Sequence, residues 1–162
     1  MAYDITNPYF RNEVLSAPPE KLRLLLLEGC VHFLEQGREG VVEKDWEKAY
    51  EGNGQAKDIL FELVATMNRS AAPELCERVA ALYMFIIKEI TLAGFEKDVD
   101  RLDECLRLMR YEVETWKMLM DKLKGDAGAK ATTARATPAA YGPPKPGGTA
   151  QGSSGGSLSL SA

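Results

Sequence analysis

The sequence has little of what catalytic and metal sites are built from. Among its 162 residues there is one histidine, His32, and there are three cysteines, Cys30, Cys76 and Cys105. The cysteines are far apart and form no CxxC pair, so a zinc site is not expected. A di-iron site in a helical bundle needs Glu-x-x-His pairs on two helices, and Gly29 stands three residues before the single histidine. We therefore expect no cofactor, no metal and no enzymatic activity.

An apolar run long enough to span a membrane is also missing. The longest purely aliphatic run, Leu24 to Leu27, is far too short to span a bilayer, and no apolar signal-peptide core follows Met1. The net charge is −4, and no basic stripe of the kind that binds nucleic acid is present. Widely spaced cysteines in apolar helical contexts are typical of a reducing compartment. These features predict a cytosolic, cytoplasmic protein with no membrane insertion and no nucleic-acid partner.

Composition divides the chain into three parts. Residues 18–124 are rich in Leu, Glu, Lys and Arg, whereas Ala, Gly, Pro, Ser and Thr dominate residues 125–162. A segment of the second kind cannot bury enough apolar surface to offset its ordering entropy, so residues 125–162 are predicted to be a disordered tail. Residues 1–17 form an N-terminal extension that is too apolar for a free tail. We expect it to lie on the domain as a cap over a site that it can vacate, through Tyr9, Phe10 and Val14.

Residues 18–124 are predicted to be an all-α, antiparallel four-helix bundle. Two helix-start signals, residues 16–20 and 70–74, each combine a serine cap, proline in the first turn and a glutamate. The expected helices span about 19–39, 43–68, 73–94 and 98–124. The strongest periodic pattern lies in the last of these, where apolar residues recur every three or four positions: Leu102, Leu106, Met109, Val113, Trp116, Met120 and Leu123.

Glycines mark two uncertain places in this scheme. Gly37 and Gly40 are interpreted as the end of the first helix. Gly52 and Gly54 lie within the second helix, where each costs about 1 kcal/mol relative to alanine. They mark either a kink or the close approach of another backbone, and the pattern does not decide between the two.

The third helix is apolar on more than one face. Residues 79–87 are nine consecutive apolar residues, although a helix that faces one neighbour needs only a narrow stripe. After the core stripe is assigned, Ala80, Tyr83 and Ile87 remain together on one flank. In a chain this short, such a flank is either further core or a surface that binds a partner.

Several segments, taken in order, resemble the FliS family of flagellar export chaperones. They are Asn7-Pro8-Tyr9, the helix start at residues 17–22, Leu27-Glu28-Gly29-Cys30, residues 56–63 with Met67-Asn68, residues 82–86, and Thr115-Trp116-Lys117. The resemblance covers residues 5–124. The sequence departs from the family at Phe85 and Ile86, which stand where the family has Tyr and Met, and at the two glycines of the second helix. The resemblance does not explain the tail.

The resemblance implies a non-enzymatic, cytosolic type III export chaperone. Such a protein binds the disordered C-terminal segment of flagellin, prevents its premature polymerisation and presents it to the flagellar export apparatus. The implied partners are flagellin, an export gate of the FlhA type and a regulator of the FliW type. The N-terminal extension then suits a cap that the client displaces.

The apolar flank of the third helix then becomes a candidate client groove. With two residues of the second helix, the predicted groove is Ile59, Val64, Ala80, Tyr83 and Ile87; the alternative for all of them is ordinary core. Two other functions stay open. One is a structural helical protein that self-associates through its apolar flanks. The other is a metal-dependent bundle enzyme, and the only residues that favour it are Glu28 and Glu35, which lie near His32 on the same helix.

Overall fold

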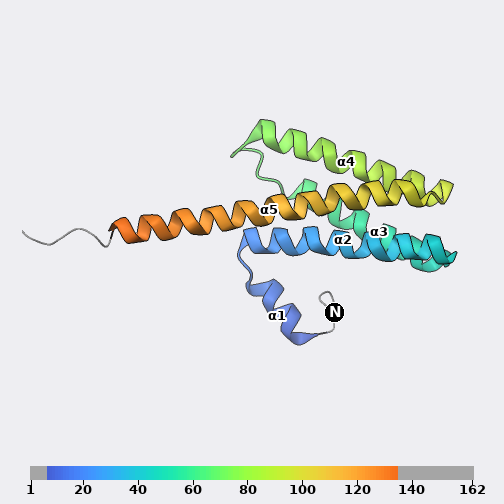
Figure 1. The fold of residues 1–162 in the computed structure, drawn as a ribbon, viewed down its shortest axis with the longest axis horizontal. Helices are drawn as coiled ribbons and strands as arrows, with labels where there is room; N and C mark the ends of the chain where they lie inside the picture. Colours follow the sequence, from blue (N-terminus) through green and yellow to red (C-terminus); the bar gives the residue numbers. More distant parts are fainter. Residues whose placement is uncertain (1–6, 135–162) are drawn as a thin grey trace, which may run out of the picture.

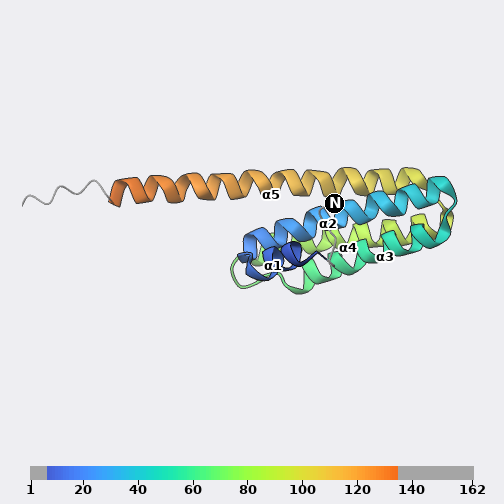
Figure 2. The same ribbon diagram turned by 90° about the horizontal axis from the view of Figure 1, so that it is seen from below.

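The computed structural model describes residues 7–134, apart from the side chains of Phe10 and of residues 130–134. The described helices are α1 (Pro8–Ser16), α2 (Pro19–Glu43), α3 (Trp46–Ala65), α4 (Pro73–Glu96) and α5 (Val99–Ala134). Helices α2 to α5 run antiparallel in a four-helix bundle, in which each packs against two neighbours (Figures 1 and 2). The all-α bundle predicted from the periodicity is thus confirmed.

Helix α2 is longer than the sequence indicated. It continues through Gly37 and Gly40, and its last residue is Glu43. Lys44 forms the C-terminal cap with a left-handed backbone (φ 59°). Helix α3 then begins at Trp46, capped by the carboxylate of Asp45, which accepts the Lys48 N–H at 3.1 Å. The interpretation of the two glycines as the end of the helix is wrong, because both lie buried inside α2.

The reason for these glycines is the close approach of α2 and α3. A Cβ atom on Gly52 would lie 2.4 Å from the backbone nitrogen of Gly37, and one on Gly40 would lie 2.4 Å from that of Ala49. Such distances leave room only for hydrogen, so glycine is required where the two backbones touch. Of the two explanations left open for Gly52, close approach is the one that the structure supports.

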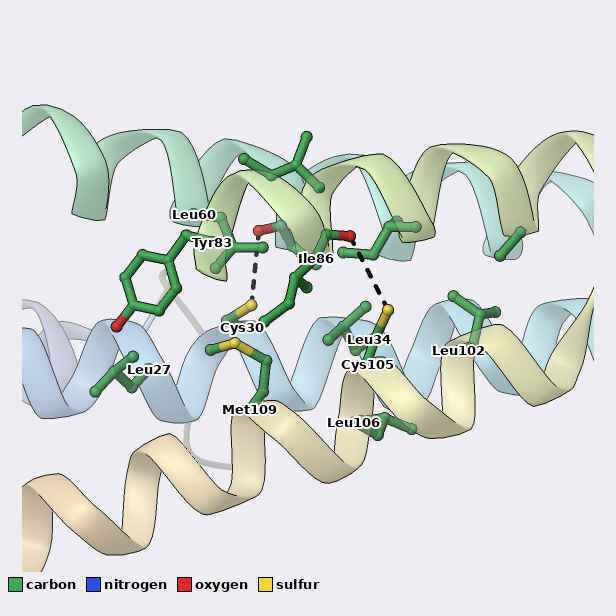
Figure 3. Packing of buried hydrophobic residues seen from close by; sticks show 14 of the residues in the cluster. Leu27, Cys30, Leu34, Leu60, Tyr83, Ile86, Leu102, Cys105, Leu106 and Met109 are labelled. Atoms are coloured by element: carbon green, nitrogen blue, oxygen red, sulfur yellow. Dashed lines mark hydrogen bonds between the residues drawn. The ribbon is translucent and has the colours of Figure 1, made fainter. Parts of the chain in front are cut away.

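The core runs along the inside of α2 to α5 (Figure 3). Its largest fully buried side chains are Leu27, Leu34, Leu60, Leu63, Tyr83, Ile86, Ile90, Leu102, Leu106 and Met109. Two cysteines also lie there, and their thiols donate weak hydrogen bonds to backbone carbonyls: Cys30 to Ala56 at 3.6 Å and Cys105 to Ile86 at 4.0 Å. Burial raises the pKa of both thiols, that of Cys105 to about 12, so both remain protonated and unreactive.

Ion pairs join the outer edges of α2 and α5. Glu35 contacts Arg110 at 2.7 Å, Glu28 contacts Lys117 at 3.1 Å, and Arg38 pairs with Asp103. All of these groups are exposed to solvent, which screens the attraction, so the pairs add little to the stability of the fold. Their main effect is to fix the register in which α5 lies along α2.

Helix α5 extends beyond the bundle (Figure 2). It runs to Ala134, whereas residues 125 onward were predicted to be disordered, so the structure differs from that prediction for residues 125–134. The residues after Lys124 include several alanines, which are the best helix formers. Adding turns to an existing helix also avoids the cost of nucleation. Residues 135–162 lie outside the described part of the chain.

Candidate functional site

A groove lies between residues 46–61 of α3 and the last turns of α4, residues 90–95. Its volume is about 770 Å³. Buried residues form its base, namely Val41, Ala49, Asn53 and Ile90, and four aromatic residues stand around it, namely Trp46, Tyr50, Phe61 and Phe95. We call this feature the α3–α4 groove.

The aromatic residues of the α3–α4 groove are unusually exposed. Tyr50 and Phe95 are 83% and 82% exposed, and Phe61 and Trp46 are 49% and 44% exposed. The ammonium group of Lys97 lies 3.9 Å from the centre of the Trp46 ring, a cation–π contact that holds this ring in place. Single exposed apolar residues are ordinary, but several gathered around one hollow are typical of a surface that binds an apolar partner.

Asn53 is the buried polar residue at the base of this groove. Its side chain is 6% exposed, and within the described part of the chain its Oδ1 accepts no hydrogen bond. This oxygen lies against Gly37, where a Cβ atom would be only 2.1 Å away. A buried polar atom without a partner costs about 1–3 kcal/mol.

The groove predicted from the sequence is divided between core and half-buried positions. Tyr83 is 1% exposed and Ile87 is 7% exposed, so both belong to the core. Their burial has a simple cause: α4 lies between α3 and α5, and the two neighbours together cover the flank that the sequence left unassigned. Ile59, Val64 and Ala80 are half-buried. In this structure Tyr83 and Ile87 therefore belong to the core and not to an exposed surface, and a flagellin-binding role for the five residues stays a prediction.

Tyr83 shows how completely that flank is enclosed. Its hydroxyl donates a hydrogen bond to Glu112 Oε2 of α5 at 3.3 Å. Burial, and then the negative charge of Glu112, raise the pKa of the Tyr83 hydroxyl well above its usual value. The side chain is a structural link between α4 and α5.

The aromatic stripe of α3 was not predicted from the sequence. Trp46, Tyr50 and Phe61 fall within one arc of the helix at 100° per residue, beside the arc that holds the core residues. The signal was therefore present as a second stripe on α3. It was hidden because Gly54 and the charged residues Lys57 and Asp58 interrupt it.

The described part of the N-terminal extension, residues 7–17, does not cover the bundle. Helix α1 points away from the axis of α2, and Tyr9 is 84% exposed (Figure 1). Val14 is half-buried, and the side chain of Phe10 lies outside the described residues. The expected packing of Tyr9 on the domain is not observed. The extended backbone at Ala17 and Pro18 turns the chain between the two helices, and the 2.7 Å ion pair between Glu13 and Lys21 holds the junction.

A second, smaller hollow lies at the end of the bundle where α1 joins α2. Its volume is about 440 Å³, and its apolar lining includes Leu22, Leu26, Met67, Leu75, Val79 and Trp116. The Trp116 indole N–H donates to the backbone oxygen of Glu20 at 2.9 Å, and the Arg23 guanidinium lies 5.3 Å from its ring centre. Trp116, predicted as core, therefore closes the start of α2 against α5 while remaining half-buried.

Two properties of the described residues bear on the type of protein. They contain no group of three or more His, Cys, Asp or Glu side chains placed to hold a metal ion. No described helix combines the length and the apolar character that crossing a membrane requires. An all-helical bundle with an aromatic groove on one face has the architecture of a helical binding module.

Comparison with known proteins identifies the family. Residues 1–123 match the family model described as flagellar protein FliS. The chain is 28% identical to the flagellar secretion chaperone FliS of Bacillus subtilis, an alignment that covers 75% of this chain and 92% of the relative. It is 25% identical to the protein of the same name from Campylobacter jejuni, over 68% of this chain and 87% of the relative. The relative from Vibrio cholerae is 24% identical, with 65% and 77% covered.

The chain belongs to the FliS family, which is a family of chaperones and not of enzymes. The resemblance seen in the sequence is thereby confirmed. The match ends at residue 123, so the last turns of α5 and all that follows them lie outside the family's common region.

Proposed function

We propose that this protein is a cytosolic export chaperone that binds the disordered C-terminal segment of flagellin. It keeps flagellin from polymerising early and hands it to the flagellar type III export apparatus. An export gate of the FlhA type receives the loaded chaperone, and a regulator of the FliW type is a further partner. The proposal rests on membership of the FliS family, whose relatives carry the name flagellar secretion chaperone.

The observation that carries the proposal is the α3–α4 groove. A client that folds into an amphipathic helix needs a long apolar groove with anchoring sites for its side chains. The rim residues Tyr50, Phe61 and Phe95 are exposed in the free chain, and burying large aromatic side chains gives much of the energy of such interfaces. Half-buried Ile59 lies two residues before Phe61, about 160° away around α3, and packs against the core instead of extending this groove.

The N-terminal extension fits this function as a displaceable cap. Residues 1–17 join the bundle next to the smaller hollow around Met67, Leu75 and Trp116. We propose that this extension, with Tyr9, Phe10 and Val14, covers that hollow in part of the free molecules and leaves it when flagellin binds, because a second part of the client segment, beyond the part in the α3–α4 groove, occupies the hollow.

Calorimetric titration with the C-terminal segment of flagellin from the same organism tests the proposal. We expect one-to-one binding, a negative heat-capacity change from the burial of apolar surface, and a gain of helix by circular dichroism. Phe61→Glu and Phe95→Glu place a charge on the groove rim and should weaken binding at least about tenfold. Tyr111→Glu, on the exposed side of α5, is the matched control and should bind as the natural chain does.

A flat titration at high concentration would contradict the proposal. It should be repeated with residues 1–17 deleted, to exclude masking by the cap. The competing function, self-association through apolar surfaces, is distinguished by analytical ultracentrifugation. A stable dimer that is lost in Phe61→Glu and ignores flagellin would favour it.

A further inference from the structure

Five glycines in the helices of the bundle differ in what lies beside them. A Cβ atom on Gly40 or Gly52 would lie 2.4 Å from a backbone nitrogen of the neighbouring helix. A Cβ atom on Gly37 would lie 2.1 Å from the buried side chain of Asn53 and 3.0 Å from its backbone nitrogen. Packing therefore requires glycine at all three positions. Gly54 of α3 and Gly94 of α4 have no heavy atom within 4 Å of that place. A helix interior disfavours glycine relative to alanine, and nothing within the described chain compensates at these two positions.

Gly54 and Gly94 lie on opposite walls of the same feature. Both line the α3–α4 groove, one on each helix that forms it. Without side chains at these two places, the groove has a strip where the helix backbones themselves are exposed between the aromatic residues of its rim. The buried oxygen of Asn53, next to Gly54, has no hydrogen-bond partner in the described structure, but it lies against Gly37 of α2 and takes no part in this strip.

The size and charge of the groove indicate its occupant. A helix about 11 Å across occupies roughly 500 Å³ per turn, so about 770 Å³ receives between one and two turns of a helix. The lining contains two acidic residues, Glu51 and Asp58, and two basic residues, Lys57 and Lys97. Because these charges cancel, the groove offers no charged partner an electrostatic advantage and suits an uncharged, apolar helical face.

We infer that Gly54 and Gly94 are specificity-determining residues for the client helix. They allow a helical turn whose contacting face carries small residues to approach the backbones of α3 and α4 closely. The inference rests on the proposed flagellin-binding function and assigns this turn of the client to the α3–α4 groove. Close helix approach through small residues on both partners gives specificity, since a client with bulky residues on that face cannot enter.

The test separates binding from stability by means of single alanine variants in the full-length chain. Gly54→Ala and Gly94→Ala add a methyl group in open space and improve helix propensity, so the melting temperature of the free chain should stay equal or rise. Binding of the flagellin C-terminal segment should nevertheless weaken about tenfold or more, because the added methyl groups occupy space that the client needs. Gly125→Ala in α5, where the surrounding space is equally open, is the matched control. It should raise or maintain stability and leave the affinity unchanged.

The outcomes are distinguishable. If the natural chain binds the segment and Gly54→Ala and Gly94→Ala bind it equally well, the inference is overturned and the proposed function stands. If the natural chain does not bind, both are overturned. If either variant unfolds at a lower temperature than the natural chain, the position is not open, and the inference is overturned on that ground.

Discussion

The backbones of Gly37 and Gly52 lie in direct contact where α2 crosses α3. A Cβ atom on Gly52 would stand 2.4 Å from Gly37 N and 2.7 Å from the carbonyl oxygen of Phe33. Neither neighbour can move as a flexible side chain would, because both are backbone atoms inside a helix. The pairing of α2 with α3 therefore depends on the absence of a single methyl group.

Alanine at this contact should destabilise the fold. We expect Gly52→Ala to lower the free energy of unfolding by about 1–3 kcal/mol, since the two helices must separate to admit the methyl group. Urea denaturation followed by circular dichroism measures the change. Gly54→Ala, two residues along the same helix, is the control and should not lose stability. Equal behaviour of the two variants would contradict the close-contact explanation.

A charge at Ile87 should unfold the bundle instead of selectively removing a binding function. Ile87 is 7% exposed, and Ile87→Glu would bury a carboxylate with no partner, at a cost of about 3–5 kcal/mol. Thermal denaturation should show a large loss of stability. Phe61→Glu, at a position 49% exposed, should unfold near the temperature of the natural chain. An Ile87→Glu protein of natural stability would show that α4 exposes this flank in solution.

Stability should fall as the solution becomes strongly alkaline. Burial, and then the charges of Glu89 and Glu104, raise the pKa of the Cys105 thiol from its ordinary 9.0 to about 12. Between these two values the unfolded chain loses the thiol proton while the folded chain keeps it, so the free energy of unfolding decreases with rising pH. Urea denaturation at pH values from 8 to 11 should show this decline. The slope should be shallower in Cys105→Ala, and identical slopes in the two proteins would contradict the assignment.

Removal of everything after Lys124 should leave the bundle intact. The side chains of residues 121–129 are exposed, so the extended end of α5 contributes little to the core. We expect a chain that ends at Lys124 to match the full-length protein within about 0.5 kcal/mol in free energy of unfolding. A larger loss, measured by thermal or urea denaturation, would mean that the extension packs on the bundle.

Periodicity predicted the bundle because each helix carries one apolar stripe, and such a stripe has few other ways to become buried. Periodicity could not predict whether the side chains of Tyr83 and Ile87 are buried or exposed. The spacing of residues along one helix does not say how many neighbours will pack against it. Nor could it show that Gly52 is required while Gly54 is not, since the two differ only in what stands opposite them in space. The aromatic stripe of α3 was readable in principle, but only after the core face of that helix was known.

The part of α5 that extends beyond the bundle acts as a spacer. From residue 121 to Ala134 the helix adds 14 residues at about 1.5 Å each, which places its end on the order of 20 Å beyond the last turn that touches α2. The α3–α4 groove, with Trp46 and Phe95, lies toward the opposite end of the molecule, where α5 begins (Figure 1). A fluorophore or affinity tag joined at the C-terminal end of α5 would therefore stand far from the groove, and it offers a handle for immobilising the protein with its binding face free.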